Sequence, residues 1–246
     1  MRFTKFLTAA AAVLTMTGGA LAADLPTMKG PPAYMPPPPP FFTWAGLYVG
    51  GQVGYAWGHV ASTLVPAVPL PPIPSYSPTG VIGGAHIGYN WQMGPLVYGL
   101  EGDVDGSSYK GNAMWGPFLG LSTRYPVQGS IRGRLGYAFD HVLLYATGGA
   151  AFASITETLS IPIIAYTESH SRARVGWTVG GGLEYAIDNN WSVRGEYRYT
   201  NYGTFSDPIN FAPAFSIRKT EDEHRVQVGF SYKFDFMAPS PVVAKY

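Results

Sequence analysis

The sequence predicts an all-β fold, an eight-stranded antiparallel transmembrane β-barrel in which the strands form a simple meander. Three observations support this prediction: a two-residue alternation of apolar and polar side chains, no apolar run long enough for a membrane helix, and a regular exchange of short and long connections. A period of two describes a strand whose two faces meet different surroundings. Lipid outside and a polar lumen inside would supply those surroundings.

The chain begins with a segment that is typical of a secretory signal peptide, residues 1–22. Arg2 and Lys5 give it a positive start, an apolar run follows, and Ala20-Leu21-Ala22 forms a small-residue cleavage site. The apolar run is too short to span a membrane. We therefore expect an exported protein whose mature chain begins at residue 23.

A proline-rich leader follows at residues 23–43, with an unbroken proline run at residues 36–40. Such a stretch neither pairs in a sheet nor forms a helix, so it should be extended. A periplasmic spacer is the first interpretation, and a binding motif for a periplasmic partner is the alternative. The barrel would then occupy residues 44–236 and a short tail residues 237–246.

Eight segments of the mature chain alternate over enough residues to form tilted membrane-spanning strands. They are residues 44–59, 81–92, 96–105, 125–138, 142–156, 173–187, 191–202 and 224–236. In the last segment every second residue from Val226 to Phe236 is apolar or aromatic, whereas Arg225 to Asp235 are polar or small. In water such an apolar row would be an aggregation template, but acyl chains accept it. The fifth segment is apolar and glycine-rich on both faces, so its register stays unassigned.

The connections between these segments alternate in length. The short ones are residues 93–95, 140–141 and 188–190, and the long ones are residues 60–80, 106–124, 157–172 and 203–223. Outer-membrane barrels have short turns on the periplasmic side and long loops outside the cell. The long connections should therefore be extracellular loops.

Composition agrees with this class of protein. The chain has 16 basic and 15 acidic residues, 13% charged residues, 15% aromatic residues and no cysteine. Such a balanced charge gives no indication of a nucleic-acid partner. The absence of cysteine excludes a disulfide-stapled secreted domain.

Charged residues recur at positions that should face the lumen. They are Glu101, Asp103, Glu184, Glu196, Arg132, Arg134, Arg194, Arg198, Arg225 and Lys233. Eight strands enclose an interior that side chains just fill, and buried charge must be paired. We therefore predict an ion-pair plug centred on Glu196, which lies between Arg194 and Arg198 on one face. A narrow ion path through the same residues is the alternative.

Several motifs together resemble a known family. They are Trp44-Ala45-Gly46-Leu47-Tyr48-Val49-Gly50, Tyr145-Ala146-Thr147-Gly148-Gly149, Gly180-Gly181-Gly182-Leu183-Glu184-Tyr185, Glu196-Tyr197-Arg198-Tyr199 and Pro241-Val242-Val243-Ala244-Lys245-Tyr246. Their order and spacing are similar to those of the small outer-membrane surface antigens of alphaproteobacteria, a porin-like family with the fold of opacity adhesins. The resemblance implies an abundant barrel in the Gram-negative outer membrane that supports envelope integrity and surface contacts, among outer-membrane lipid and lipopolysaccharide. It does not indicate an oligomeric state.

The last segment also resembles the signal that the outer-membrane assembly machinery reads, with Gln227, Gly229, Tyr232 and Phe234 as its residues. The alternative to an assembly signal is purely structural, because any final barrel strand alternates in a similar way. Ten residues follow Phe236, so the signal would be internal unless Tyr246 is read instead.

Enzymatic interpretations find little support. The five histidines, His59, His86, His141, His170 and His224, are scattered, and none has the spacing of a metal site or lies in a recognisable catalytic motif. Asp103-x-Asp105 lacks the rest of a calcium loop and is better explained as a charged strand end. We expect no enzyme, cofactor or metal. The function classes, in order, are a structural and surface-interaction barrel, a small diffusion channel and an outer-membrane lipid-modifying enzyme.

Overall fold

The computed structural model describes residues 42–66, 75–116, 119–209 and 212–235. The predicted signal peptide, nearly all of the predicted leader and the predicted tail lie outside these residues, so they stay predictions.

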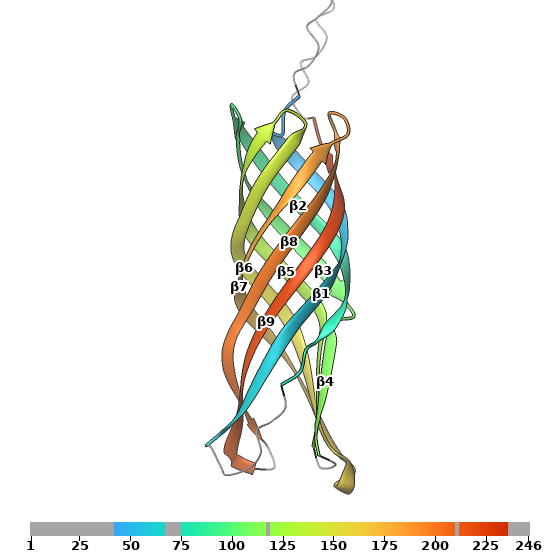
Figure 1. The fold of residues 1–246 in the computed structure, drawn as a ribbon, viewed down its shortest axis with the longest axis vertical. Helices are drawn as coiled ribbons and strands as arrows, with labels where there is room; N and C mark the ends of the chain where they lie inside the picture. The colour runs from blue at the N-terminus through green and yellow to red at the C-terminus, as the bar shows by residue number, and fades with distance from the viewer. Residues whose placement is uncertain (1–41, 67–74, 117–118, 210–211, 236–246) are drawn as a thin grey trace, which may run out of the picture. The chain divides into compact units, whose positions relative to one another are not determined.

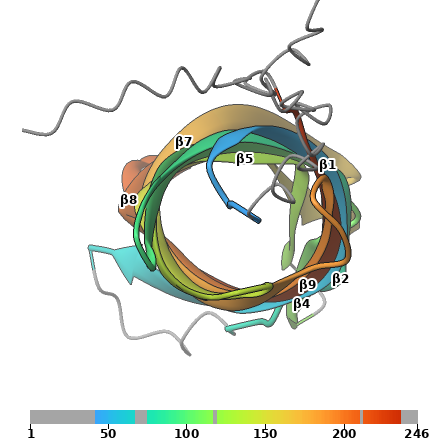
Figure 2. The ribbon, with the colours of Figure 1, turned by 90° about the horizontal axis from the view of Figure 1, so that it is seen from above.

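The described chain is almost wholly antiparallel β-strand, and the strands close into a ring (Figure 1). The strands are β1 (Gly46–Val65), β2 (Thr79–Met93), β3 (Leu96–Ser107), β4 (Lys110–Trp115), β5 (Leu119–Phe139), β6 (Val142–Ile161), β7 (Tyr166–Ala186), β8 (Trp191–Ile209) and β9 (Ala212–Lys233). Strand β1 pairs with both β2 and β9, which closes the ring that Figure 2 shows end-on. Strand β4 continues the line of β3 and pairs with β5, so the ring has eight positions. This confirms the predicted eight-stranded barrel, whose closure leaves no sheet edge unpaired in lipid.

Helix is nearly absent from the described residues. It is limited there to the 3-10 turn η1 (Pro162–Ile164), and no helix among these residues has the length and apolar character needed to cross a membrane.

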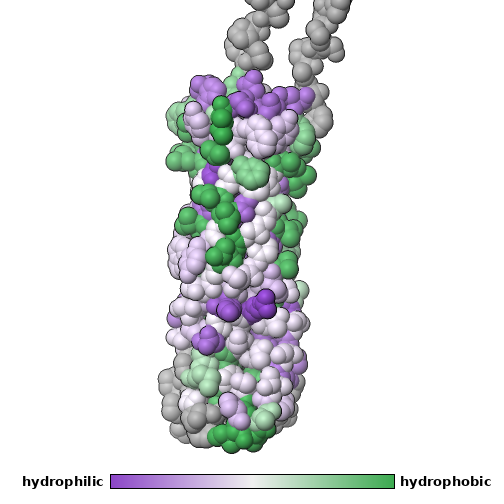
Figure 3. Space-filling view, turned by 90° about the vertical axis from the view of Figure 1, so that its right-hand side faces the viewer, coloured by the Kyte–Doolittle hydropathy of each residue, from purple (hydrophilic) through white to green (hydrophobic). Residues whose placement is uncertain are grey.

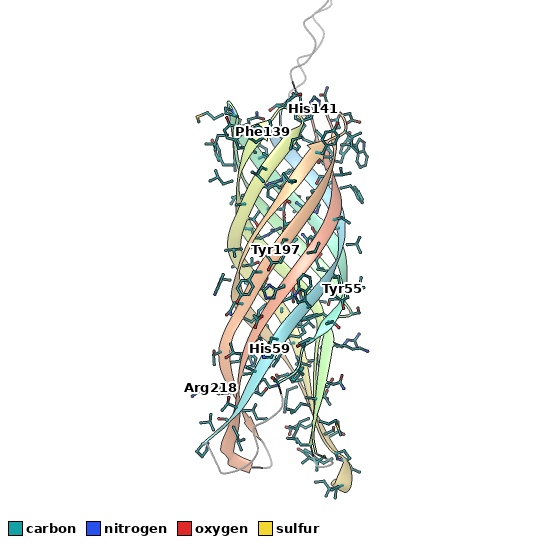
Figure 4. All side chains as sticks on the ribbon, in the orientation of Figure 1. Tyr55, His59, Phe139, His141, Tyr197 and Arg218 are labelled. Atoms are coloured by element: carbon teal, nitrogen blue, oxygen red, sulfur yellow. The ribbon has the colours of Figure 1, made fainter. Side chains whose placement is uncertain are left out.

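Side chains alternate between the lumen and the outer wall, as the sequence pattern predicts. On the outer wall Val104, Ile131 and Val175 are 64%, 63% and 65% exposed. Figure 4 shows Tyr55 and Tyr197 on this wall, about midway along the barrel. Apolar side chains cover much of the upper half of the face in Figure 3, toward the short turns. Apolar residues exposed at this density fit a wall that contacts acyl chains.

The structure also assigns the register of the fifth predicted segment, which lies in β6. Leu143, Tyr145 and Thr147 are buried in the lumen, whereas Leu144 and Phe152 are exposed on the outer wall. The sequence could not distinguish these faces because both are apolar.

The long connections are shorter than predicted. Strand β1 continues to Val65, β4 and the start of β5 occupy most of residues 106–124, and β6 and β7 are separated only by η1 and Ala165. The outer face of these extensions carries hydroxyl side chains, such as the Thr158–Ser169 pair with 2.9 Å between its oxygens. The apolar row that marks a lipid-facing strand is missing there, so the sequence pattern did not reveal the strands. β-Branched threonine nevertheless favours them.

The three short turns are where the sequence places them. Gly94 and Asp140 adopt left-handed backbone conformations with φ of 59° and 55°, which glycine and aspartate tolerate. In the third turn Asp188 Oδ1 accepts the backbone N–H groups of Trp191 and Asn190 at 2.7 and 2.8 Å. These two hydrogen bonds hold the pKa of the Asp188 carboxyl below its usual range.

Candidate functional site

The lumen is filled with ionised side chains that pair with one another. We call this set the luminal network; its members are Glu101, Asp103, Asp105, Glu184, Glu196, Glu223, Arg132, Arg134, Arg194, Arg198 and Arg225. All of them are less than 6% exposed. Buried charge is stable only when it is paired, and every member has an oppositely charged partner.

Arg132 of β5 is the most highly connected cation of the luminal network. It forms an ion pair with Glu101, a second with Glu196 at 2.7 Å and a third with Asp103 at 3.8 Å. Its guanidinium also donates to Thr147 Oγ1 at 3.0 Å. Three carboxylates from two strands therefore converge on one planar cation.

Two arginines of β8 cross the lumen. Arg194 contacts Glu101 at 2.5 Å, and Arg198 contacts Asp103 at 2.7 Å. In the ring order four steps separate β3 from β8 in either direction, so these strands lie opposite each other. Both ion pairs therefore join opposite walls of the barrel.

Glu196 lies in the network but is not flanked as predicted. It contacts Arg198 at 2.9 Å and Arg132 at 2.7 Å, and it accepts the Tyr145 hydroxyl hydrogen at 3.0 Å. Arg194, which precedes it on the same face, bonds to Glu101 instead. Arg132 rather than Glu196 is thus the centre of the network.

Sequence reasoning missed two carboxylates of the network, which both contact Arg225. Asp105 lies 2.9 Å from this guanidinium and Glu223 lies 2.7 Å from it. Gln128, from the opposite strand β5, accepts from Arg225 and donates to Glu223 at 2.8 Å. Asp105 had been interpreted as a strand end and Glu223 as part of a loop. Glu223 lies two residues before Arg225 and so on the same face, which was the available signal.

Arg134 and Glu184 form the end of the network nearest the short turns. They are ion-paired, Ser192 donates to Glu184 at 2.5 Å, and the Arg134 guanidinium stacks 3.9 Å from the Tyr145 ring centroid. Lys233 does not join them, which corrects its predicted place. Its ammonium donates to the Thr43 carbonyl, and among the described residues its ion-pair partner is Asp235, at 3.9 Å.

Apolar layers bound the network at both ends. Toward the short turns, Trp44 packs with other buried residues, and its indole N–H donates to the Asp140 carbonyl at 3.0 Å. Figure 2 shows the segment before β1 bending into the ring there. The other layer lies toward β4 and consists of Ala56, Ile82, Tyr109, Tyr125, Ala151, Ala153, Ile155 and Tyr202.

Close packing in the lumen explains its inward glycines. At Gly88 an added Cβ would lie 2.4 Å from the Tyr48 ring, which is far inside contact distance. Tyr48 uses this space to donate its hydroxyl hydrogen to Glu101 at 2.8 Å. Glycine at residue 88 therefore leaves room for the Tyr48 ring, whose hydroxyl reaches Glu101.

The histidines lie apart from one another. His86 is buried with Nε2 3.0 Å from Ser231 Oγ, but its Nδ1 has no hydrogen-bond partner in the described part of the chain. A nucleophilic serine needs a carboxylate on that nitrogen to orient the imidazole. The described residues contain no group of three or more His, Cys, Asp or Glu side chains placed to hold a metal ion.

Three of the predicted assembly-signal residues lie in β9, and Phe234 follows its last residue. Gln227 points into the lumen, 3.3 Å from Glu196 Oε1, while the Tyr232 and Phe234 rings pack edge to face at 5.1 Å. Their recognition by the assembly machinery stays a prediction.

Comparisons with known proteins agree with this architecture. Residues 37–234 match the family model for the outer membrane protein beta-barrel domain. The chain is 33% identical over 225 residues to the 25 kDa outer-membrane immunogenic protein of Brucella abortus biovar 1 (strain 9-941), covering 91% of this chain and 95% of that protein. It is 31% identical over 198 residues to the 22 kDa outer membrane protein of Rhizobium leguminosarum bv. viciae, covering 80% and 82%.

Among solved structures, the outer membrane protein OprG from Pseudomonas aeruginosa is similar in fold. It matches with a TM-score of 0.53 at 13% identity, over 77% of this chain and 96% of that one. The family match and the curated relatives together place this protein in the outer membrane. The chain belongs to the outer-membrane β-barrel protein family.

Proposed function

We propose that the protein is a structural and surface-interaction barrel of the outer membrane whose lumen is closed by the luminal network. The observation that carries this proposal is the pair of contacts across the barrel, Arg194–Glu101 at 2.5 Å and Arg198–Asp103 at 2.7 Å. Side chains that touch from opposite walls occupy the space that a water column would need. An eight-stranded barrel has little further room at its centre.

The apolar layers at both ends of the luminal network also support a lumen that is closed to ions. Ions crossing the lumen would have to pass Trp44 at one end and the tyrosines near β4 at the other, where Tyr109 and Tyr125 are 1% exposed. An ion loses its hydration in such a layer and gains no charged partner. The luminal network would thus serve stability rather than transport.

Surface interactions would take place at the end of the barrel that carries the long connections. Two relatives from Brucella, of 25 kDa and 31 kDa, are named outer-membrane immunogenic proteins, which describes those proteins. Short periplasmic turns and longer extracellular connections are the rule for this class of barrel. We therefore assign the end that carries η1 to the cell surface, where it can contact partners.

Cysteine labelling tests this orientation, because the chain has no native cysteine. Ile163 in η1 is 63% exposed, and Asn189 is exposed in the turn between β7 and β8. A membrane-impermeant maleimide should label Ile163→Cys on intact cells and Asn189→Cys only after the outer membrane is permeabilised. The reverse pattern would invert the topology. Proteolysis at Arg218 or Lys219 is a poorer test of orientation, since both residues lie in β9 and pair with strands on either side.

A small diffusion channel is the second candidate. A shallow cleft at the short-turn mouth is lined in part by Asn90, Glu184 and Lys233, which would give a channel a polar entrance. Conductance of the purified barrel in a planar bilayer separates the two functions: a closed barrel gives no steady current. The third class, a lipid-modifying enzyme, would change the lipid A of cells that express the protein, and we expect no such change.

A further inference from the structure

Two cations face each other on the outer wall just beyond the apolar band. Lys110 of β4 and Arg124 of β5 are direct cross-strand partners, and both are exposed. Their chain neighbours Tyr109 and Tyr125 are buried at 1% exposure. Because side chains alternate along a strand, the ammonium and the guanidinium both project from the outer wall.

This pairing is unfavourable in the isolated chain. Like charges directly opposite each other on one face of an antiparallel pair destabilise it, since their Cβ atoms are only about 4.5 to 5.5 Å apart. Within the described residues no carboxylate forms an ion pair with either side chain. The cation Lys219, by contrast, is paired with Glu157. An anion supplied from outside the chain would remove the repulsion.

The height of the pair on the barrel indicates where that anion comes from. On β5 the next outward residue toward the short turns is Val127, which is 49% exposed. On β2, Val81 is 54% exposed. The next outward residue away from the short turns is Thr79, the cross-strand partner of Lys110. The two cations therefore lie where the apolar wall ends, which is the level of lipid headgroups. Figure 3 shows strongly hydrophilic side chains below the apolar half of that face.

We propose that Lys110 and Arg124 form a binding site for a phosphate group of a phosphorylated glycolipid in the outer leaflet. The guanidinium fork suits two phosphate oxygens and the ammonium supplies a point charge. Thr79 exposes a hydroxyl donor beside Lys110 on the same face. The acyl chains of the lipid would then lie along the apolar wall formed by Val81, Val104 and Val127. This site rests on the proposed topology, which puts β4 at the outer leaflet.

Binding of lipid A to the folded mature protein in neutral detergent micelles, measured by native mass spectrometry, tests the site. Bis-phosphorylated lipid A should bind the wild type at least about tenfold more tightly than lipid A without phosphate, since each charge-assisted hydrogen bond contributes about 1.5 to 3 kcal/mol. The variant Lys110→Ala/Arg124→Ala should lose that preference. Lys110→Arg/Arg124→Lys should keep it. The control Arg218→Ala removes another exposed cation, which lies nearer the long connections than His59 (Figure 4), and should bind like the wild type.

Three results would overturn the site. The first is that bis-phosphorylated lipid A binds the wild type and the double variant equally well. The second is that Arg218→Ala loses as much lipid A binding as the double variant does. The third is full competition by millimolar inorganic phosphate, which would indicate a general anion site. Folding of each variant is checked by its heat-modifiable gel mobility, and Lys110→Gln/Arg124→Gln replaces the alanine variant if that fails to fold. A failure of the proposed topology would appear separately, as labelling of Asn189→Cys on intact cells.

Discussion

Arg132→Ala is expected to lower the free energy of unfolding by about 3 to 5 kcal/mol, the usual loss when one partner of a buried ion pair is removed. Arg132 contacts Glu101, Asp103 and Glu196 and is 1% exposed. Its removal leaves six buried carboxylates with four arginines in the luminal network, which began with five. Urea unfolding of the barrel in lipid vesicles measures the change.

A double-mutant cycle of Arg132→Ala and Glu196→Ala tests this prediction further. Glu196→Ala alone should also destabilise the barrel, because it removes one carboxylate partner from each of Arg132 and Arg198. The two substitutions together should cost less than the sum of the single ones, since the unpaired charges disappear together. The exposed Arg218→Ala serves as the control and should have little effect. A loss of under about 1 kcal/mol for Arg132→Ala would mean that water reaches these carboxylates, which contradicts a closed lumen.

Leu100→Arg and Val228→Arg are each expected to reduce the stability of the inserted barrel by about 2 to 4 kcal/mol, because they place a cation on the lipid-facing wall near the midplane. Leu100 and Val228 are 58% and 59% exposed on that wall. Leu100 precedes Glu101 on β3, and Glu101 is buried within the luminal network. Leu100 is therefore on the outer wall at the level of that network. Folding from urea into vesicles gives the free energy.

The matched control for these substitutions is Ser122→Arg. Ser122 is exposed on the outer face of β5, but it lies past Arg124, beyond the apolar band. Its substitution should cost much less than the other two, and equal costs at all three positions would show that the apolar wall does not meet lipid. An inward control at Gln128 is unsuitable. Gln128 is 2% exposed and bonds to Arg225, so an arginine there would bring two cations together.

The wall of the barrel was predictable because lipid imposes a strict rule on each strand separately. Every lipid-facing residue has to be apolar or small, so Val226, Val228 and Phe230 reveal their face without knowledge of any neighbour. The rule ends with the apolar band. The extensions of β6 and β7 carry Thr158 and Ser169 on the outer face. Water accepts polar side chains there, so the apolar row is missing and the sequence suggested loops.

The ion-pair partners were not predictable, because they depend on how the strands are staggered around the ring. Arg194 and Glu196 are close in sequence, yet Arg194 bonds to Glu101 on the opposite wall. The same stagger brings Asp105 to Arg225 and leaves Lys233 at the mouth of the barrel. Alternation gives the face of a side chain, whereas partner choice needs the register of all eight strand positions.

Single-barrel conductance in a planar bilayer tests most directly whether the luminal network closes the barrel. The wild type is expected to give no steady current, and Glu196→Ala should lower stability without a lasting rise in conductance, since Arg194–Glu101 and Arg198–Asp103 still join opposite walls. A steady current through the wild type, with an ion selectivity that Glu196→Ala changes while stability hardly moves, would contradict the closed barrel and establish a channel.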